Sequence, residues 1–173
     1  MKKLLALSLL LLISIASVYA ANYQFLQKDL SIILAEDPRN SGIKINSHYK
    51  DYINPSILVI DIKAIPGDKS PADVFRILLQ FAHRLQENDF ESVLLSSSGK
   101  TKFMLQGDYF KKIGMEYPFQ NPVYTMRTFP ENLYQPNGDR AFNSWTGGFL
   151  GVTQKQLEDF TEFHKQWYIK DMM

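Results

Sequence analysis

Two short apolar runs near the middle of the chain predict two β-strands. Residues 57–62 are rich in β-branched side chains and nearly all apolar, and residues 92–97 hold a second apolar run. Continuous rather than alternating apolar residues are typical of strands that are covered on both faces. We therefore predict strands at 57–62 and 92–97.

A helix is predicted between these strands, over residues 71–88. Ser70 can cap free backbone N–H groups, Pro71 suits the first helical position, and Asp73 lies in the positive first turn. Apolar side chains then recur at helical spacing: Val74, Leu78, Phe81, Ala82 and Leu85. A strand, a capped helix and a second strand predict a β-α-β crossover, in which the two strands are parallel.

Helices are also predicted near both ends of the domain. Apolar residues recur at helical spacing across 22–36: Tyr23, Leu26, Leu30, Ile33 and Leu34. Thr153 and Gln156 form a capping-box pattern at the start of a last helix. One face of that helix carries Leu157, Phe160, His164 and Trp167. Together these elements predict an α/β or α+β fold, with a small mixed sheet on which the N- and C-terminal helices pack.

The remaining segments are less periodic. A third strand is predicted at 102–105 and a short helix at 108–113, while 43–56 fits either a strand or a helical turn. Residues 117–151 are rich in proline, glycine and aromatic side chains. There, 136–139 predicts the tip of a hairpin, and 123–129 is the expected strand before it.

The N-terminus has the pattern of a signal peptide. Lys2 and Lys3 precede an apolar run over 4–18, and Val18-Tyr19-Ala20 suits a signal peptidase. The run is shorter than the roughly 20 residues of a membrane-spanning helix, although an uncleaved anchor stays an alternative. We predict a signal peptide at 1–20 and one globular domain at 21–173, in the periplasm or secreted, with no transmembrane segment in the mature chain.

Composition narrows the class of protein. Two of the 19 basic side chains leave with the signal peptide, so that 17 remain against 18 acidic ones. This near-neutral balance argues against a nucleic-acid partner. The chain has no cysteine, which excludes disulfides, thiol catalysis and iron–sulfur clusters. These features suit a bacterial exported protein.

Gly99-Lys100-Thr101 resembles the end of a phosphate-binding P-loop. Leu94, however, stands where that motif needs its first glycine, because only glycine makes the sharp turn around the phosphates. The stretch therefore predicts a strand end followed by a polar turn. Lys100 would lie at the carboxyl edge of the parallel strands, where it either binds an anion or is a solvated surface lysine.

No motif for a metal, a cofactor or a nucleophile is present. The three histidines, His48, His83 and His164, do not pair at metal-ligand spacing, and Gly-x-Ser-x-Gly does not occur. The remaining candidates for acid–base catalysis are Glu131, within the aromatic-rich segment, and His164, on the face of the last helix. We expect no cofactor and no metal.

The densest mixture of polar and aromatic residues is at 124–134, and it predicts a ligand-binding region. Arg127 can fork onto a carboxylate or phosphate, Asn132 can donate and accept, and Phe129 and Tyr134 offer flat faces. Trp145 adds an indole beside two glycines. The alternative is a loop pinned to its own domain by an ion pair of Arg127.

These observations favour an exported, non-catalytic binding or accessory protein of the cell envelope. Its ligand would be a small anion, a cell-wall fragment or another protein. One alternative is an envelope hydrolase acting on glycan or peptide, with Glu131 or His164 beside Arg127. Another is an inhibitor or immunity-type protein. The motifs identify no family.

Overall fold

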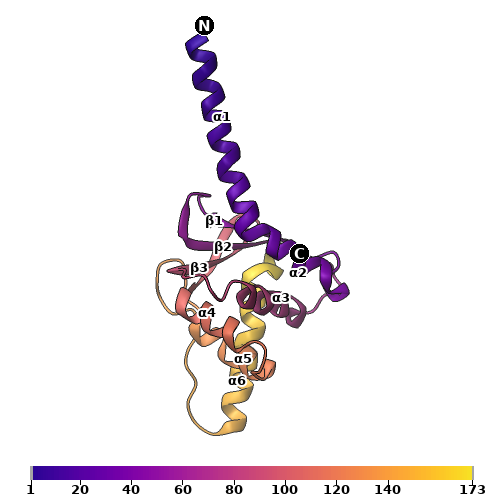
Figure 1. Cartoon of the computed structure of the whole chain (residues 1–173). Coiled ribbons are helices and arrows are strands. Elements are labelled where there is room, and N and C mark those ends of the chain that lie inside the picture. The colour runs from indigo at the N-terminus through magenta and orange to yellow at the C-terminus, as the bar shows by residue number, and fades with distance from the viewer. Residues whose placement is uncertain (1, 173) are drawn as a thin grey trace.

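A four-stranded mixed sheet forms the centre of the computed structural model, which describes residues 2–172 (Figure 1). Its strands are β1 (Lys44–Lys50), β2 (Asn54–Ala64), β3 (Ser92–Ser97) and β4 (Lys100–Gln106), in the order β1-β2-β3-β4. β2 and β3 are parallel, and the two outer pairs are antiparallel. The three predicted strands are confirmed, and the ambiguous segment 43–56 contains β1 and the turn into β2.

Helix α3 (Pro71–Arg84) makes the crossover between β2 and β3. The Ser70 hydroxyl accepts from the Asp73 N–H, and the Asp73 carboxylate accepts from the Ser70 N–H, so that the predicted cap is confirmed as a capping box. The helix ends at Arg84, four residues before the predicted end. The fold is a single α+β domain, as predicted.

One face of the sheet supplies the main core. Leu58, Ile60 and Ile62 alternate along β2, are at most 2% exposed, and pack with the side chains of the helices. Val59 and Asp61 point to the opposite face and are also buried. Asp61 accepts from the Gly99 N–H at 3.1 Å and pairs with Lys63. Burial of both side-chain sets explains why β2 has no alternation in its sequence.

The region after β4 is helical, which confirms the helix predicted at 108–113 but not the strand predicted at 123–129. Helix α4 (Gly107–Glu116) is followed by α5 (Pro122–Thr128) and the short turn η3 (Pro130–Asn132). The predicted strand at 123–129 is therefore wrong. The reason is local, because the Asn121 side chain accepts from the Val123 N–H at 2.9 Å and Pro122 takes the first helical position.

The hairpin tip at 136–139 is confirmed as a tight turn. The Gln135 N–H donates to the Asp139 carbonyl, and Tyr134 is bridged to Arg140 across the turn. Tyr134 also pairs with Met104, so that one residue on each side of the turn extends the sheet beyond β4.

The C-terminal helix, α6 (Phe149–His164), continues through η4 (Lys165–Ile169) into α7 (Lys170–Met172). It begins four residues before Thr153, with Gly148 at its N-cap and no side-chain cap bond, so the predicted capping box is wrong. The side chain of Gln156 is used elsewhere, between Arg127 and Glu131.

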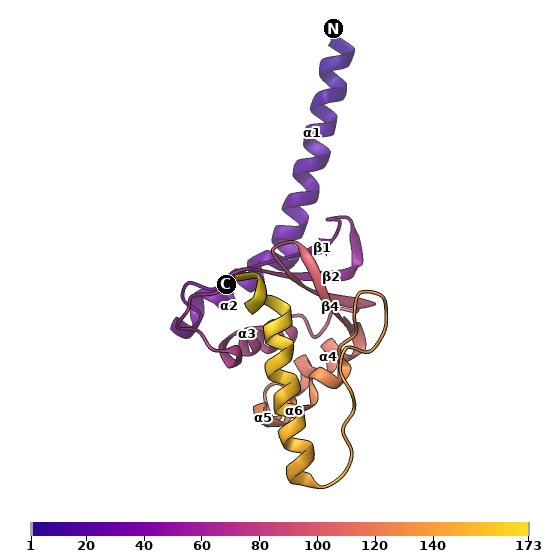
Figure 2. The ribbon, with the colours of Figure 1, turned by 180° about the vertical axis from the view of Figure 1, so that it is seen from behind.

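The N-terminal helix projects far beyond the domain (Figures 1 and 2). α1 (Lys2–Asn22), the π-helical turn η1 (Tyr23–Gln27) and α2 (Lys28–Glu36) follow without a break, and η2 (Pro38–Asn40) ends the run. Ala6–Glu36 is long enough to cross a membrane and contains an 18-residue window with a mean hydropathy of 1.7. A signal sequence near an N-terminus meets the same criteria. The apolar, exposed helix is consistent with the predicted signal sequence.

Candidate functional site

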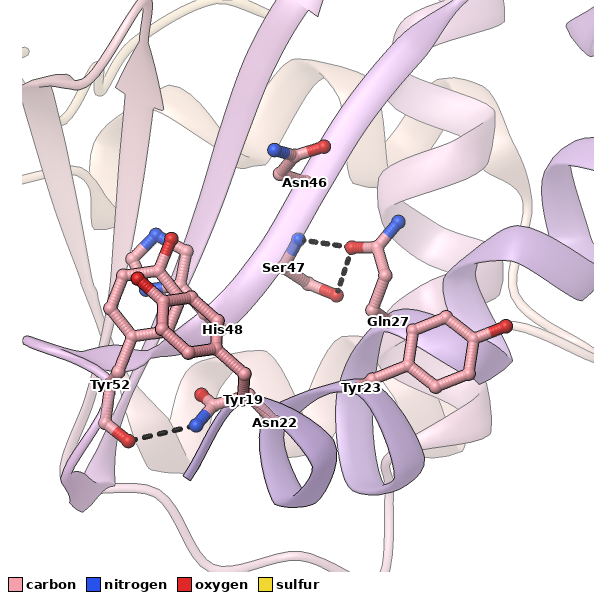
Figure 3. A pocket seen from close by; sticks show the side chains of 8 residues that line it. All are labelled: Tyr19, Asn22, Tyr23, Gln27, Asn46, Ser47, His48 and Tyr52. Carbon is pink, nitrogen blue, oxygen red and sulfur yellow. Dashed lines mark hydrogen bonds between the residues drawn. The ribbon is translucent and has the colours of Figure 1, made fainter. Parts of the chain in front are cut away.

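The free edge of β1 is closed by side-chain amides of the N-terminal helix. An edge strand exposes unpaired N–H and C=O groups, which invite pairing with another strand. Here Asn22 Oδ1 accepts from the Tyr49 N–H at 2.7 Å. Gln27 Oε1 accepts from the Ser47 N–H, also at 2.7 Å (Figure 3). Gln27 Nε2 lies 3.4 Å from the Ile45 carbonyl oxygen. The two amides make the contacts that a fifth strand would make, so a partner strand cannot add here.

The π-helical turn η1 is what brings both amides to β1. Asn22 and Gln27 are five residues apart, which in an α-helix would place them on different faces. The extra residue in the turn also rotates the preceding residues by about 100° relative to α2. Tyr23, predicted to lie on the buried stripe, is consequently 56% exposed, while Leu26 and Leu30 are fully buried as predicted.

A cavity of about 310 Å³ opens where this helix meets β1 and the β1–β2 turn. Tyr52 lies in that turn with a φ of 64°, a conformation that bulky residues rarely adopt. Asn22 Nδ2 holds it by donating to the Tyr52 carbonyl at 2.8 Å. The Tyr52 ring stacks on His48, with ring centroids 4.4 Å apart and planes 9° apart, and Tyr19 packs against it at 4.9 Å. Strained backbone held in this way is common at ligand sites.

Around these rings the cavity presents polar groups that the fold does not use. The Asn46 amide makes no hydrogen bond with the residues that the structure describes, and Tyr23 is open to solvent. His48 Nδ1 lies 2.7 Å from the Tyr49 carbonyl oxygen and so carries the proton of the neutral ring, which leaves Nε2 as an acceptor. The site therefore combines a stacked aromatic face with donors and acceptors, but no ion pair (Figure 3).

The sequence-predicted region around Arg127 is organised differently. Arg127 Nε donates to Gln156 Oε1 at 3.0 Å, and Gln156 Nε2 donates to Glu131 Oε1 at 2.7 Å. Arg127 and Glu131 are thus joined through one buried amide from α6. Neither lines the cavity beside β1.

Three further predicted binding residues make contacts inside the fold. Phe129 is fully enclosed and packs edge-on against Phe75 at 4.9 Å, so its ring offers no surface. Asn132 Nδ2 donates to the Thr128 carbonyl at 2.9 Å, and the Arg140 guanidinium lies 5.8 Å from the ring centre of Tyr134.

Trp145 is held against α6. Its indole N–H donates to Asp159 at 2.6 Å, and the Lys155 ammonium lies over the ring at 4.8 Å. Lys100 stays exposed at the start of β4. Neither Lys100 nor any of these side chains lines the cavity beside β1. Whether they bind a ligand stays a prediction.

The stretch that resembled a P-loop is a strand end followed by a polar turn, as predicted, and the turn joins β3 to β4 as a hairpin. Ser98 and Gly99 have φ values of 51° and 81°, which is the pattern of a two-residue type I′ turn between antiparallel strands. The Gly99 N–H, which a P-loop would direct at phosphate, donates to Asp61. Lys102 pairs with Asp171 at 2.9 Å.

His164 is the most enclosed titratable group with a shifted pKa. It is 0% exposed among aromatic side chains, its Nδ1 lies 3.2 Å from the Tyr168 hydroxyl, and burial lowers its pKa from 6.5 to about 3. Its Nε2 atom has no hydrogen-bond partner among residues 2–172. The described residues contain no group of histidines and carboxylates that could hold a metal ion.

Sequence reasoning missed the site beside β1. Its members lie at residues 19–27 and 46–52, and only the polar Asn22 and Gln27 within an apolar helix pattern hinted at a contact. No family model matches the chain, and no curated protein or solved structure is significantly similar to it.

Proposed function

We propose that the chain is an exported, non-catalytic binding protein of the cell envelope whose ligand is a glycan fragment. The N-terminal helix directs export and is cleaved near Ala20, which releases the domain to the periplasm or the medium. Cleavage there leaves Asn22 and Tyr23 as the second and third residues of the mature chain. The two hydrogen bonds from Asn22 to the β1–β2 hairpin do not depend on the removed residues. Tyr19, which packs against Tyr52, leaves with the signal peptide, so the mature site keeps the rings of Tyr52 and His48 without it.

The stacked rings of Tyr52 and His48 are the observation that carries this proposal. The apolar face of a sugar ring packs well on a flat aromatic surface, and sugar hydroxyls pair with amides, phenols and imidazole nitrogens. Asn46, Tyr23 and His48 supply such groups around Tyr52. The absence of an ion pair in the lining suits a neutral ligand better than an anion.

The two residues named for acid–base catalysis support binding rather than hydrolysis. Glu131 accepts a hydrogen bond from Gln156, and His164 has no exposed surface from which to reach a substrate. Neither lies at the cavity beside β1.

Binding of a β-1,4-linked trimer of N-acetylglucosamine to protein purified from the periplasm tests the proposal by calorimetry. We expect Tyr52→Asn to weaken binding by about tenfold, since the ring contributes stacking area worth about 1 kcal/mol or more. Asparagine is chosen because it tolerates a positive φ better than alanine does.

The control is Tyr124→Asn, which removes an exposed tyrosine on α5, outside the cavity beside β1. No binding by the unaltered protein, or equal losses in both variants, would contradict the glycan site. Mass spectrometry of the purified chain gives its first residue. A chain that keeps Met1 and sediments with membranes would contradict cleavage near Ala20.

A further inference from the structure

Helix α2 packs against α3 (Figure 1), and a second cavity, of about 460 Å³, is lined by residues of both helices. Gln80, His83 and Arg84 reach it from one face of α3, and Glu36 reaches it from the end of α2. Its apolar lining comes from the side chains of Ile33, Pro38 and Tyr117. It is separate from the cavity beside β1 and shares no residue with it.

The carboxamide oxygen of Gln80 is the unusual atom of this cavity. It is buried and accepts no hydrogen bond from the residues that the structure describes. A buried polar atom without a partner is unfavourable by about 1–3 kcal/mol, so a turn of the Gln80 amide that brings this oxygen to a donor in the cavity is favoured.

Two other groups at the cavity can also accept a hydrogen bond. The Glu36 carboxylate makes no ion pair or hydrogen bond within residues 2–172, and it stands at the C-terminal end of α2, where the helix dipole favours a cation. His83 Nδ1 lies 3.0 Å from the Gly114 carbonyl oxygen, so that the neutral ring keeps Nε2 as an acceptor.

The charged groups that could oppose a cation are already paired. Arg84 Nε donates to Asp29 at 3.0 Å, and Arg39 and Arg76 both approach Asp37. Asp37 is itself paired with those two arginines and is therefore not one of the free acceptors. The groups left for a ligand therefore include three acceptors, on Gln80, Glu36 and His83, besides the Gln80 amide N–H groups and the Tyr117 hydroxyl. They lie beside an aromatic and aliphatic wall.

We propose that this cavity binds a primary amine carried on a short unbranched aliphatic chain. The ammonium donates to Gln80 Oε1 and to the Glu36 carboxylate, and its chain lies along Ile33 and Pro38. The Tyr117 ring, whose centre is 5.7 Å from that of His83, adds an aromatic face that attracts cations. A lysine-type side chain and a free alkyl diamine share this chemistry.

The test is titration of the full-length protein with 1,5-diaminopentane, followed by calorimetry and NMR shifts. We expect 1,5-pentanediol, which has the same length but no charge, to bind at least about tenfold more weakly, and glutarate not to bind. Shifts should centre on α2 and the end of α3. Equal binding of diol and diamine would overturn the proposal.

The Gln80→Leu variant distinguishes a ligand-binding oxygen from an unpaired oxygen that only destabilises the fold. Because leucine removes the unpaired oxygen at similar size, the melting temperature should rise, while diamine binding should fall at least about tenfold. Gln135→Leu, on the exposed hairpin turn, is the matched control and should change neither. A lower melting temperature for Gln80→Leu, or unchanged diamine binding, would contradict the assignment.

Glu36→Gln gives a second measurement that does not depend on folding of the Gln80 variant. The side chain is exposed, so the melting temperature should not change, and diamine binding should weaken several-fold. The isomorphous control is Glu87→Gln, at an exposed residue beyond the end of α3. Equal binding in Glu36→Gln and the unaltered protein would again contradict the site.

The source of the amine is distinguished by two separate titrations. Binding of Nα-acetyl-lysine amide indicates an amine carried on a peptide, and binding of diaminopentane indicates a free one.

Discussion

Two glutamines, Gln27 in η1 and Gln80 on α3, show opposite uses of the same side chain. Gln27 accepts from the backbone and hydroxyl of Ser47 and so completes an edge strand. Gln80, across α2, keeps a buried oxygen that nothing in the described chain satisfies. The Gln27 amide makes the hydrogen bonds that a neighbouring strand would make, whereas the Gln80 oxygen is left for a ligand to bind. The hydrogen-bond partners of an amide, rather than its residue type or burial, therefore distinguish a structural amide from a ligand-binding one.

The largest expected effect concerns His164, which, like Gln80, has a buried atom without a partner but no cavity beside it. Its pKa falls from 6.5 to about 3 in the fold because burial disfavours the charged ring. Between these pH values the unfolded chain binds a proton that the folded chain does not, so stability decreases as the pH falls. The decrease approaches about 1.4 kcal/mol per pH unit well below pH 6.5. From pH 6.5 to 4.5 it is about 2.3 kcal/mol, because half of the unfolded histidine is already protonated at pH 6.5.

Urea unfolding at pH 6.5 and 4.5 measures this loss, and His164→Phe should remove most of it. Asp37 and Asp73 have pKa values lowered to about 2, chiefly by hydrogen bonds from Arg39 and Ser70. Their stabilising effect is present above the ordinary carboxyl pKa and is lost only below about pH 4. Glu162, whose pKa is lowered from 4.5 chiefly by a hydrogen bond from Gln166, contributes only at the lower end of this window, so the difference between the two proteins gives the share of the histidine. An equal loss in His164→Phe would show that another group titrates.

The same substitution at the two glutamines should change stability in opposite directions. Gln27→Leu leaves the buried Ser47 N–H without an acceptor, and we expect a loss of about 2 kcal/mol. Gln80→Leu removes an unpaired oxygen and should gain about 1 kcal/mol. Urea unfolding of both variants gives the two signs, and two losses of similar size would end the distinction between these amides.

The sequence predicted the sheet and its crossover well because those elements follow simple periods. Continuous apolar runs specified β2 and β3, and the cap at Ser70 specified the start of α3. The wrong strand at 123–129 came from weighing side-chain type above capping, although Asn121 and Pro122 carried the signal for a helix.

Neither cavity could be predicted from the periodic spacing of apolar residues in the sequence. Asn22 and Gln27 meet β1 only because η1 inserts an extra residue, and Tyr52 meets His48 only because its φ is positive. The unpaired Gln80 oxygen depends on the packing of α2, α3 and the end of α4 together. These are tertiary consequences, and a helical or strand pattern in one segment does not encode them.

A third glutamine, Gln156, tests whether the number of hydrogen bonds or access to water decides the cost of losing an amide. It is 6% exposed and bonds to Arg127 and Glu131, so by number of partners it resembles Gln27. Its partners are half-buried charged side chains, however, and they can turn towards water or towards each other, which the Ser47 N–H cannot do. We therefore expect Gln156→Leu to lower stability by less than about 1 kcal/mol, against about 2 kcal/mol for Gln27→Leu. Urea unfolding of the two variants under one condition decides the point. Equal losses of stability would mean that the number of hydrogen bonds lost, rather than the burial of the partners left behind, determines the cost. The contrast between Gln27 and Gln80 would then need another cause.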